Sequence, residues 1–363
     1  MRGFTLRFII ALGAFALASL SFAKESKNVV ALSSAQTTTA TSAGRAESLL
    51  ERAIERFAAT SGGIVGVSAI LIESGRRVSL NGGMRFPMAS VYKLPIALQL
   101  LHKVDRGELR LSDPVTLSEN GFRPGHSPIA EFANNKPVTL TVERLLELML
   151  GESDNSASDA LLRLAGGPAA VTARMRALGV AGIDVSRPEG QLILNHRGVR
   201  ELPPESEWTM ALLDSLSAKI TPAESEAAAA AYANDPRDTS TPDAMADLLA
   251  RVHRRDALEP ASMERVLQIM TATQTGPARL KGLLPVGTVV AHKTGTMGGT
   301  TNDVGIVTLP GGAGHLAIAV FVKGSTKDVP ERERAIAEIA RTVYDFFMLQ
   351  PVRAPQTSVL LTF

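Results

Sequence analysis

Residues 289–322 have the sequence VVAHKTGTMGGTTNDVGIVTLPGGAGHLAIAVFV, and this stretch decides the fold. It contains three β-rich runs: Val289–Thr296, Asp303–Leu309 and His315–Val322. Turn residues separate them at Gly298-Gly299 and at Pro310-Gly311-Gly312. Short β-rich runs divided by glycine and proline are typical of consecutive strands joined by tight turns. The stretch therefore predicts three strands near the C-terminal end of the domain.

The N-terminal part of the chain mirrors this pattern. Ile64–Ile72 and Arg77–Leu80 are expected to form two strands around the turn Glu73-Ser74-Gly75. Helices flank the strands at both ends, since apolar residues recur at helical spacing in residues 45–59 and in Glu331–Phe347. The two termini are thus expected to build one sheet together.

The region between these strands is predicted to be helical. Candidate helices are Val142–Gly151, Ala157–Ala165, Pro168–Leu178, Pro242–His253 and Met263–Thr271, with Thr141, Thr241 and Gly179 as caps. The predicted class is α/β of the α+β type, an antiparallel sheet built from both termini and flanked by helices, with an inserted all-helical lobe. The expected lobes are 45–86 with 286–349, and 87–285. We expect a catalytic cleft between the two lobes, since ligand sites often lie where two parts of a protein meet.

Composition excludes several classes of protein. The 363 residues are 45% hydrophobic and 20% charged, as in soluble globular proteins. The net charge of +2, without a basic stripe, argues against nucleic-acid binding. The six histidines show no H-x-x-x-H or H-x-H spacing, so no metal site is indicated. No cysteine is present, which excludes disulfides and a lipid-bearing cysteine.

The N-terminus resembles an export sequence. Arg2 and Arg7 precede an apolar run from Phe8 to Leu20, and Ser21-Phe22-Ala23 follows. This order predicts a signal peptide over residues 1–23, cut after Ala23, and hence a periplasmic protein. A stable membrane anchor is the alternative, but the 13-residue run is shorter than the roughly 20 residues that a bilayer requires. Residues 24–44 are expected to form a flexible leader, and the tail 350–363 has no clear role.

A serine and a lysine three residues apart stand at the start of an expected helix. Pro87-Met88-Ala89 interrupts the chain before Ser90-Val91-Tyr92-Lys93, and an apolar helical stretch continues to Leu101. Ser90 is then at a helix N-terminus, where free N–H groups stabilise an oxyanion. Lys93 shares its helix face, so its amine can reach the Ser90 hydroxyl. Taken alone, this common pattern is better explained by a capping serine and a surface lysine.

Two more motifs follow in the chain. Ser153-Asp154-Asn155 precedes a predicted helix, where a simple capping turn would use the same residues. Lys293-Thr294-Gly295-Thr296 ends a predicted strand, and Gly295 would allow a substrate to approach the backbone closely. A strand-end turn with an exposed lysine is the alternative.

The three motifs together, in this order, resemble those of the class A β-lactamases and their relatives, the penicillin-binding proteins. The similarity runs from about Ala46 to Phe347 and includes residues 153–168 (SDNSASDALLRLAGGP), 275–285 (TGPARLKGLLP) and 292–305 (HKTGTMGGTTNDVG). It implies a β-lactamase/transpeptidase-like fold. It also implies hydrolysis of the β-lactam amide bond through an acyl-serine intermediate, conferring resistance, with small-molecule substrates and no cofactor.

The resemblance also implies roles for individual residues. Ser90 would attack the lactam carbonyl, with Lys93 as general base and hydrogen-bond partner. The N–H groups of Ser90 and Thr296 would form the oxyanion hole, and Ser153 would relay a proton to the lactam nitrogen beside Lys293. The substrate-binding residues would be Asn155 for the acylamide group and Thr294, Gly295, Thr296 and Arg279 at the carboxylate. His126 is at the position of an aromatic gatekeeper, although a surface histidine is almost as good an interpretation.

A glutamate after the helical segments would separate a hydrolase from a protein that is only acylated. Arg187-Pro188-Glu189 resembles the family's loop, in which the glutamate activates the water that clears the acyl-enzyme. Glu189 is 36 positions after Ser153 (189 − 153). The similar closing segment around Asp238 predicts an Arg187–Asp238 salt bridge that clamps the loop. A solvated surface carboxylate is the alternative for Glu189.

The chain departs from the family in two ways. The family pattern E-x-x-L-N places a water-holding asparagine after the glutamate, but this chain has Ile193 there. Asn195 or Gln191 could replace it, or the water could be held less well. The clamp residues are also 51 positions apart (238 − 187), so residues 196–232 form an insertion, expected to be helical cover near the cleft.

Two alternative functions remain open from the sequence. A D,D-peptidase or penicillin-binding protein acting on peptidoglycan shares the three core motifs, and a slowly deacylating β-lactam-binding protein would explain the missing asparagine. The two serines and two lysines make a cationic pocket suited to an anionic substrate. The fold needs no partner, so a monomer is expected, whereas substrate preference and inhibitor susceptibility are not readable.

Overall fold

The computed structural model describes residues 44–134 and 136–349. The predicted signal peptide, all but the last residue of the predicted leader, and the tail lie outside these ranges. Within them, no helix combines the length and the apolar character needed to span a bilayer.

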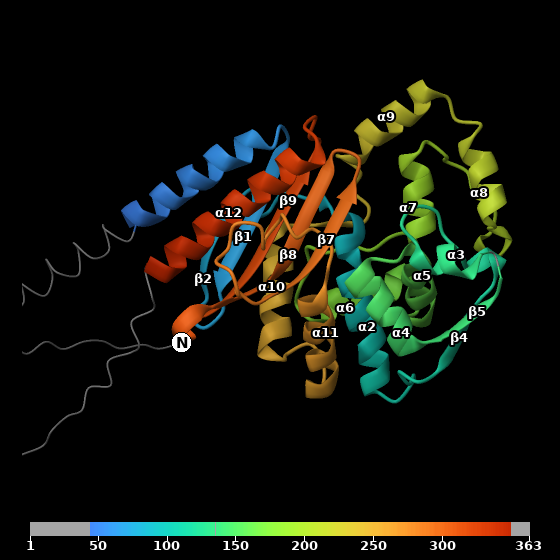
Figure 1. The fold of residues 1–363 in the computed structure, drawn as a ribbon, viewed down its shortest axis with the longest axis horizontal. Helices are drawn as coiled ribbons and strands as arrows, with labels where there is room; N and C mark the ends of the chain where they lie inside the picture. Colours follow the sequence, from blue (N-terminus) through green and yellow to red (C-terminus); the bar gives the residue numbers. More distant parts are fainter. Residues whose placement is uncertain (1–43, 135, 350–363) are drawn as a thin grey trace, which may run out of the picture. The chain divides into compact units, whose positions relative to one another are not determined.

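One antiparallel sheet is the centre of the fold, as predicted (Figure 1). Its five strands follow the order β2-β1-β9-β8-β7. Their bounds are β1 Ile64–Leu71, β2 Arg76–Leu80, β7 Val290–Met297, β8 Thr300–Leu309 and β9 Gly314–Lys323. The central strand β9 pairs on one side with β1 and on the other with β8, so it joins the N-terminal hairpin to the C-terminal meander.

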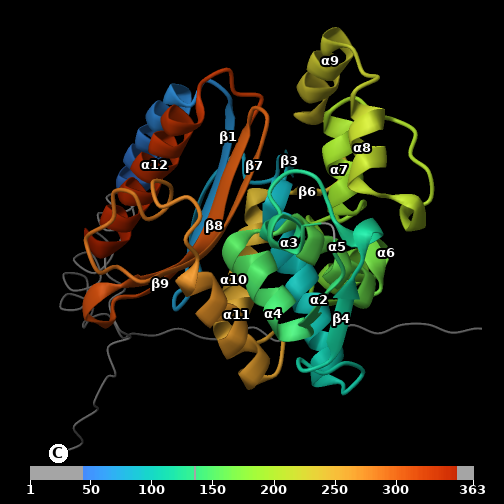
Figure 2. The same cartoon turned by 45° about the vertical axis from the view of Figure 1, so that its right-hand side comes forward.

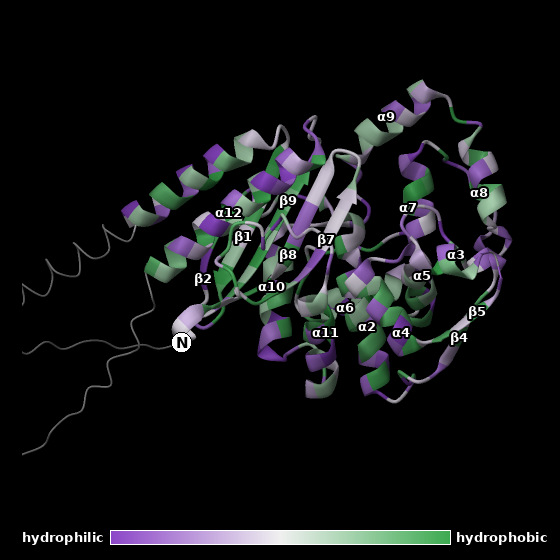
Figure 3. Ribbon diagram, in the orientation of Figure 1, coloured by the Kyte–Doolittle hydropathy of each residue, from purple (hydrophilic) through white to green (hydrophobic). Residues whose placement is uncertain are grey.

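Both faces of the sheet are buried because helices cover each of them. Along β9, Leu316, Ile318, Val320 and Val322 belong to one apolar cluster, whereas Ala317, Ala319 and Phe321 belong to the other. The first cluster includes residues of α12 (Val329–Leu349) and the second includes residues of α10 (Pro242–Arg254). Figure 2 shows these two helices on opposite faces, and Figure 3 shows the apolar strands between them. Each fully buried aliphatic side chain contributes about 1.5–3 kcal/mol.

The segment between the strands is mainly helical, but it is not all-helical as predicted. The remaining helices are the one over residues 44–60, α2 Lys93–Asp105, α3 Pro128–Ala133, α4 Val142–Glu147, α5 Asn155–Leu164, α6 Gly167–Ala177, α7 Glu189–His196, α8 Met210–Ser217, α9 Pro222–Tyr232 and α11 Pro260–Ala272. Short turns of helix are η1 Ala89–Tyr92, η2 Glu119–Gly121, η3 Leu148–Glu152, η4 Glu205–Glu207 and η5 Pro310–Gly312. Two short ladders also occur here, β3 Phe86–Pro87 with β6 Thr239–Ser240 and β4 Pro114–Leu117 with β5 Val138–Thr141. Pairing of residues far apart in sequence left no periodic pattern by which to predict these ladders.

The predicted caps are present. The Thr141 hydroxyl accepts a hydrogen bond from the Arg144 N–H at 3.1 Å, and Thr241 does the same for Ala244 at 3.2 Å. Gly179 follows α6 with φ +72°, a conformation that glycine adopts without strain. Side-chain caps of this kind typically contribute about 1 kcal/mol.

The enlarged loop 187–238, which contains the insertion 196–232, includes the helices α7, α8 and α9. It has a small apolar cluster of its own, formed by Leu194, Val199, Trp208 and Leu213. The Trp208 ring also lies 5.1 Å from the guanidinium of Arg123, which is fully buried beside α5. This packing holds the insertion against the helical part of the molecule.

Candidate active site

Ser90 lies on the short helix η1, directly before α2. The residue before it, Ala89, has φ +45°, a left-handed conformation that is strained for any residue with a side chain. The turn is held from outside, because the Asn302 amide donates to the carbonyls of Pro87 and Met88, both at 2.9 Å. A strained turn held in this way presents the Ser90 hydroxyl in a fixed position.

Lys93 is fully buried one helical turn after the serine. Its ammonium donates to the Ser153 carbonyl and to Asn155 Oδ1, both at 2.8 Å, and lies 3.5 Å from Glu189 Oε2. The Lys93 ammonium therefore donates hydrogen bonds to the Ser153 carbonyl and to Asn155, and it forms an ion pair with Glu189. Among the described residues no hydrogen bond joins Lys93 to Ser90, so the expectation of a direct bond is wrong for this state.

Ser153 lies between the two lysines of the site. Its backbone has φ +64°, and its hydroxyl accepts from Lys293 Nζ at 3.0 Å and from Lys93 Nζ at 3.4 Å. Burial lowers the pKa of Lys293 well below its usual value, and the neighbouring charge of Lys93 lowers it further. The hydroxyl is therefore in contact with two ammonium groups, one of which loses its proton unusually easily.

Glu189 is the first residue of α7 and is only 2% exposed. Its backbone N–H donates to Asp159 Oδ1 at 2.6 Å, and the Gly190 N–H donates to Asp159 Oδ2 at 3.1 Å. Asp159 thus caps α7 from α5 and aims the glutamate inward. Burial raises the pKa of Glu189, while Lys93 opposes that shift. The carboxyl group is consequently a stronger base than a surface glutamate. The alternative of a solvated surface carboxylate is wrong.

Ser90, Ser153 and Glu189 line one cleft of about 360 Å³, whereas the fully buried Lys93 and Lys293 are not among its lining residues. Its walls include Ser90, Ser153, Asn155 and Glu189 from the helical part and residues 294–297 from the edge strand β7. Ile193 and His196 of α7 also line it. A volume of this size suits a small ligand.

The residue one turn after Glu189 on the cleft side is Ile193, which is 8% exposed. Neither candidate for the missing asparagine faces the cleft. Gln191 and Asn195 line a separate pocket between α7 and α9, and the Asn195 amide is bound to Arg187 and Val199. Both possible replacements are therefore wrong in this structure.

The edge strand β7 carries Thr294, Gly295 and Thr296, and Arg279, the fourth residue expected at the substrate carboxylate, precedes this strand in the chain. The Thr294 hydroxyl contacts Thr275 at 2.7 Å, and Thr296 Oγ1 accepts from Arg279 at 2.6 Å. Arg279 is buried and paired with Glu333 at 3.0 Å. The Arg279 charge is thus already partly balanced by a carboxylate.

Gly295 was expected to make room for a substrate, and the structure shows that it also makes room for the turn before Ser90. A Cβ at this position would lie 2.5 Å from the Met88 carbonyl oxygen and 3.1 Å from the Ser90 nitrogen. The close approach is therefore made by the chain's own turn before Ser90, not only by a substrate. Because Gly295 has no side chain, the β7 backbone can lie in contact with the turn that carries Ser90.

Two further residues predicted to contact a substrate lie on the opposite wall. His126 lines the cleft and its Nε2 is 2.9 Å from the Glu152 carbonyl. Asn155 lines the cleft as well, with its Nδ2 donating to the Pro124 carbonyl at 2.9 Å. Both side chains are held in place by the protein.

Arg187 and Asp238 form the expected ion pair, with 2.6 Å between Nε and Oδ2. Both side chains are buried, and Asp238 also accepts from the N–H groups of Ser186 and Arg187. Arg187 makes a second ion pair with Asp235 at 3.0 Å. The pair joins the two ends of the enlarged loop 187–238, although 51 positions separate the two residues in the chain (238 − 187).

Two residues of the site were not singled out from the sequence. Asp159 is within the similar stretch 153–168, which could have identified it. Asn302 acts across the sheet from β8, and no local pattern indicates it.

The sequence of this chain is similar to those of known β-lactamases. The model of a family described as "Beta-lactamase enzyme family" matches residues 49–347. The extended-spectrum β-lactamase PER-1 of Pseudomonas aeruginosa is 32% identical over 305 residues, which cover 82% of this chain and 87% of the relative. The carbapenem-hydrolysing β-lactamase KPC of Klebsiella oxytoca is 29% identical, and the match covers 77% of this chain and 83% of the relative.

Solved structures lead to the same group of proteins. A β-lactamase from Chitinophaga pinensis is similar with a TM-score of 0.67 and 34% identity, and the match covers 82% of this chain and 98% of that one. An ancestral class A β-lactamase is similar with a TM-score of 0.66 and 33% identity, and the match covers 82% of this chain and 99% of that one.

Proposed function

This chain belongs to the class A serine β-lactamases and hydrolyses the β-lactam amide bond, which confers resistance, and we propose that it does so with Ser90 as nucleophile and Glu189 as the base for deacylation. The observation that carries the assignment of Glu189 is its position. It is buried in the same cleft as Ser90, with Lys93 3.5 Å from its carboxylate.

In the acylation step, Ser90 Oγ attacks the lactam carbonyl and its proton passes to Lys93. Lys93 can act as this base after it gives a proton to Glu189, whose buried carboxylate has a raised pKa. The oxyanion is stabilised by the N–H groups of Ser90 and Thr296, and one such donor contributes about 10²–10³ in rate.

The C–N bond then breaks, and the lactam nitrogen takes a proton from the Ser153 hydroxyl. Lys93, 3.4 Å from that hydroxyl, replaces this proton with the one it took from Ser90, and it then recovers its own proton from Glu189, which is again a carboxylate. The charge of Lys293, 3.0 Å from the hydroxyl, keeps the relay oriented. The substrate carboxylate is bound by Thr294, Thr296 and Arg279.

In the deacylation step, Glu189 takes a proton from a water molecule that attacks the ester carbonyl. The bond between that carbon and Ser90 Oγ then breaks, and the proton held by Glu189 returns to Ser90 Oγ by way of Lys93. Ile193 beside Glu189 provides no hydrogen bond for that water. This single observation favours the second candidate function, slow clearance, so we propose that deacylation limits turnover.

The test is turnover of a chromogenic cephalosporin combined with intact-mass measurements of the acyl-enzyme. We expect Glu189→Gln to be acylated and to keep the adduct, whereas the exposed Glu207→Gln, a matched control on the same segment, turns over normally. Parental turnover by Glu189→Gln would refute the role of Glu189. Release of D-alanine from a stem peptide, with stable penicillin labelling, would favour the D,D-peptidase alternative.

Export is the second part of the proposal. The order of charged, apolar and small residues up to Ala23 supports a cleaved signal peptide and a periplasmic protein. N-terminal sequencing of protein from a periplasmic extract tests this, and retention of Met1 would contradict it. We also expect a monomer, which light scattering during size-exclusion chromatography would check.

A further inference from the structure

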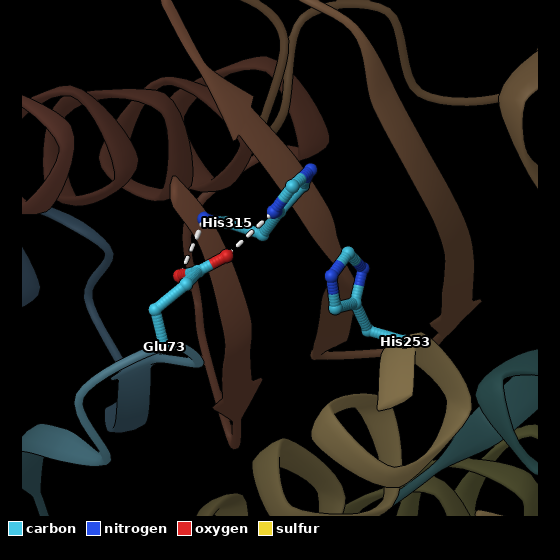
Figure 4. Close-up of side chains that lie close together, drawn as sticks. All are labelled: Glu73, His253 and His315. Carbon is cyan, nitrogen blue, oxygen red and sulfur yellow. Dashed lines mark hydrogen bonds and ion pairs between the residues drawn. The ribbon is translucent and has the colours of Figure 1, made fainter. Parts of the chain in front are cut away.

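Two histidines and a glutamate from three separate elements meet at one end of the sheet, away from the catalytic cleft. Glu73 belongs to the turn between β1 and β2, His253 to the last turn of α10, and His315 to the start of β9. Figure 4 shows Glu73 joined to His315 by two dashed lines, with the His253 ring facing His315. Each residue offers a ligand atom, and the three atoms lie within 4.8 Å of one another.

The contacts within this cluster are close. Glu73 Oε1 lies 2.7 Å from His315 Nδ1, and Glu73 Oε2 accepts from the His315 backbone N–H at 2.9 Å. The ring centroids of His253 and His315 are 4.0 Å apart. Gly314 makes room for the carboxylate, because a Cβ there would lie 2.4 Å from Glu73 Oε2.

We propose that Glu73, His253 and His315 form a binding site for a divalent transition-metal ion, with zinc as the ion that fits best. Two imidazoles and one carboxylate are a common zinc ligand set, with a fourth position open to water. Ligands about 2.1 Å from a zinc ion lie roughly 3.4 Å apart. The three ligand atoms lie within 4.8 Å of one another, so zinc binding would require their side chains to rotate to that spacing.

The site is accessible from solvent, since the side chains of His315 and Glu73 are 33% and 43% exposed. The nearby Arg254, whose guanidinium donates to the Ile72 carbonyl at 2.9 Å, opposes a cation and weakens binding.

A metal here would lie away from the catalytic cleft and would take no part in the reaction there. Thr294 of β7 pairs with Asp303 of β8, and Asp303 pairs with Val320 of β9. Thr294, which lines the catalytic cleft, and Val320 are therefore at the same height along the strands. His315 is five residues from Val320 along the strand (320 − 315), a distance of about 17 Å. Bound zinc would connect the β1–β2 turn, α10 and β9, and would stabilise the folded state because the unfolded chain has no such site.

The experiment measures zinc binding by calorimetry and thermal unfolding on the untagged chain after treatment with a chelator. Zinc chloride at about 100 times its dissociation constant should raise the Tm by about 5 °C. Glu73→Gln and His253→Gln should each weaken zinc binding at least about tenfold and remove at least about half of that shift. The control is His102→Gln on α2, which should bind zinc like the parent.

Turnover of a chromogenic cephalosporin without zinc should be the same in all these variants, and that result verifies that they fold. The proposal is overturned if the parent shows no zinc-dependent shift in Tm. It is also overturned if His253→Gln binds zinc as tightly as the parent, or if His102→Gln loses binding to the same extent.

Discussion

Replacing Ile193 by asparagine should speed clearance of the acyl-enzyme. Glu189 and Ile193 are one helical turn apart on α7 and line the same cleft. The Ile193 side chain extends towards Gly125, where its Cδ1 would be 3.4 Å from an added Cβ. An amide at this position could bind the water that Glu189 activates, which the isoleucine cannot do.

The size of the effect follows from one added hydrogen bond. Such a bond contributes about 0.5–1.5 kcal/mol net, which corresponds to about 2- to 13-fold in rate if it forms in the transition state. The substitution also removes an apolar side chain that is only 8% exposed. Losing that burial should lower the free energy of unfolding by about 1.5–3 kcal/mol. Faster deacylation and lower stability are therefore expected together.

The assay follows the mass of the acyl-enzyme over time after mixing with a penicillin, beside urea unfolding of each variant. Ile193→Val is the matched control, because it shortens the side chain without adding a polar group and should cost about 0.5–1.5 kcal/mol. Its deacylation rate should stay within about twofold of the parent. If Ile193→Asn clears the adduct no faster than Ile193→Val, the reasoning is refuted.

Three other predictions concern the charges and the backbone of the site. Burial lowers the pKa of Lys293, so kcat/KM should fall on the alkaline side below the ordinary lysine pKa of about 10.4. Lys293→Arg should move this limb upward, and an unchanged pH profile would contradict the assignment. Arg187→Met leaves the Asp238 carboxylate buried without its closest cation, so urea unfolding should show a loss of about 3–5 kcal/mol, and a loss below about 1 kcal/mol would argue against the clamp. Gly295→Ala puts a Cβ within 2.5 Å of the Met88 carbonyl, which should lower kcat/KM by about 10²–10³, and steady-state activity within tenfold of the parent would contradict this.

The sequence predicted the sheet and the core motifs because each depends on local patterns. Strands with β-branched residues and glycine turns are recognisable without knowing their partners, and the order of Ser90, Ser153 and Lys293 carries the resemblance to the family. The bond partners of Lys93 were not predictable in the same way. Its ammonium is engaged by Ser153 and Asn155 from 60 and 62 positions away, which depends on how α2 and α5 pack.

The cluster of Glu73, His253 and His315 was not predicted from the sequence, for a related physical reason. Spacing motifs such as H-x-x-x-H detect ligands that share one helix or strand. Glu73, His253 and His315 lie on three elements that only the sheet and α10 bring together. A search by spacing over six scattered histidines therefore returns nothing, although three-dimensional proximity identifies the set at once.

The position of the water-holding group shows how secondary structure decides chemistry here. An α-helix turns about 100° per residue, so residue 193 is about 40° from Glu189 around α7, whereas residue 195 is about 240° from it. The nearest asparagine in sequence is thus directed away from the cleft, where its amide instead accepts from Arg187 at 3.1 Å. Moving Asn195 into the catalytic role would require α7 to unwind and the clamp to lose a partner. Because both changes carry a cost, the chain can improve deacylation most readily by changing Ile193 itself.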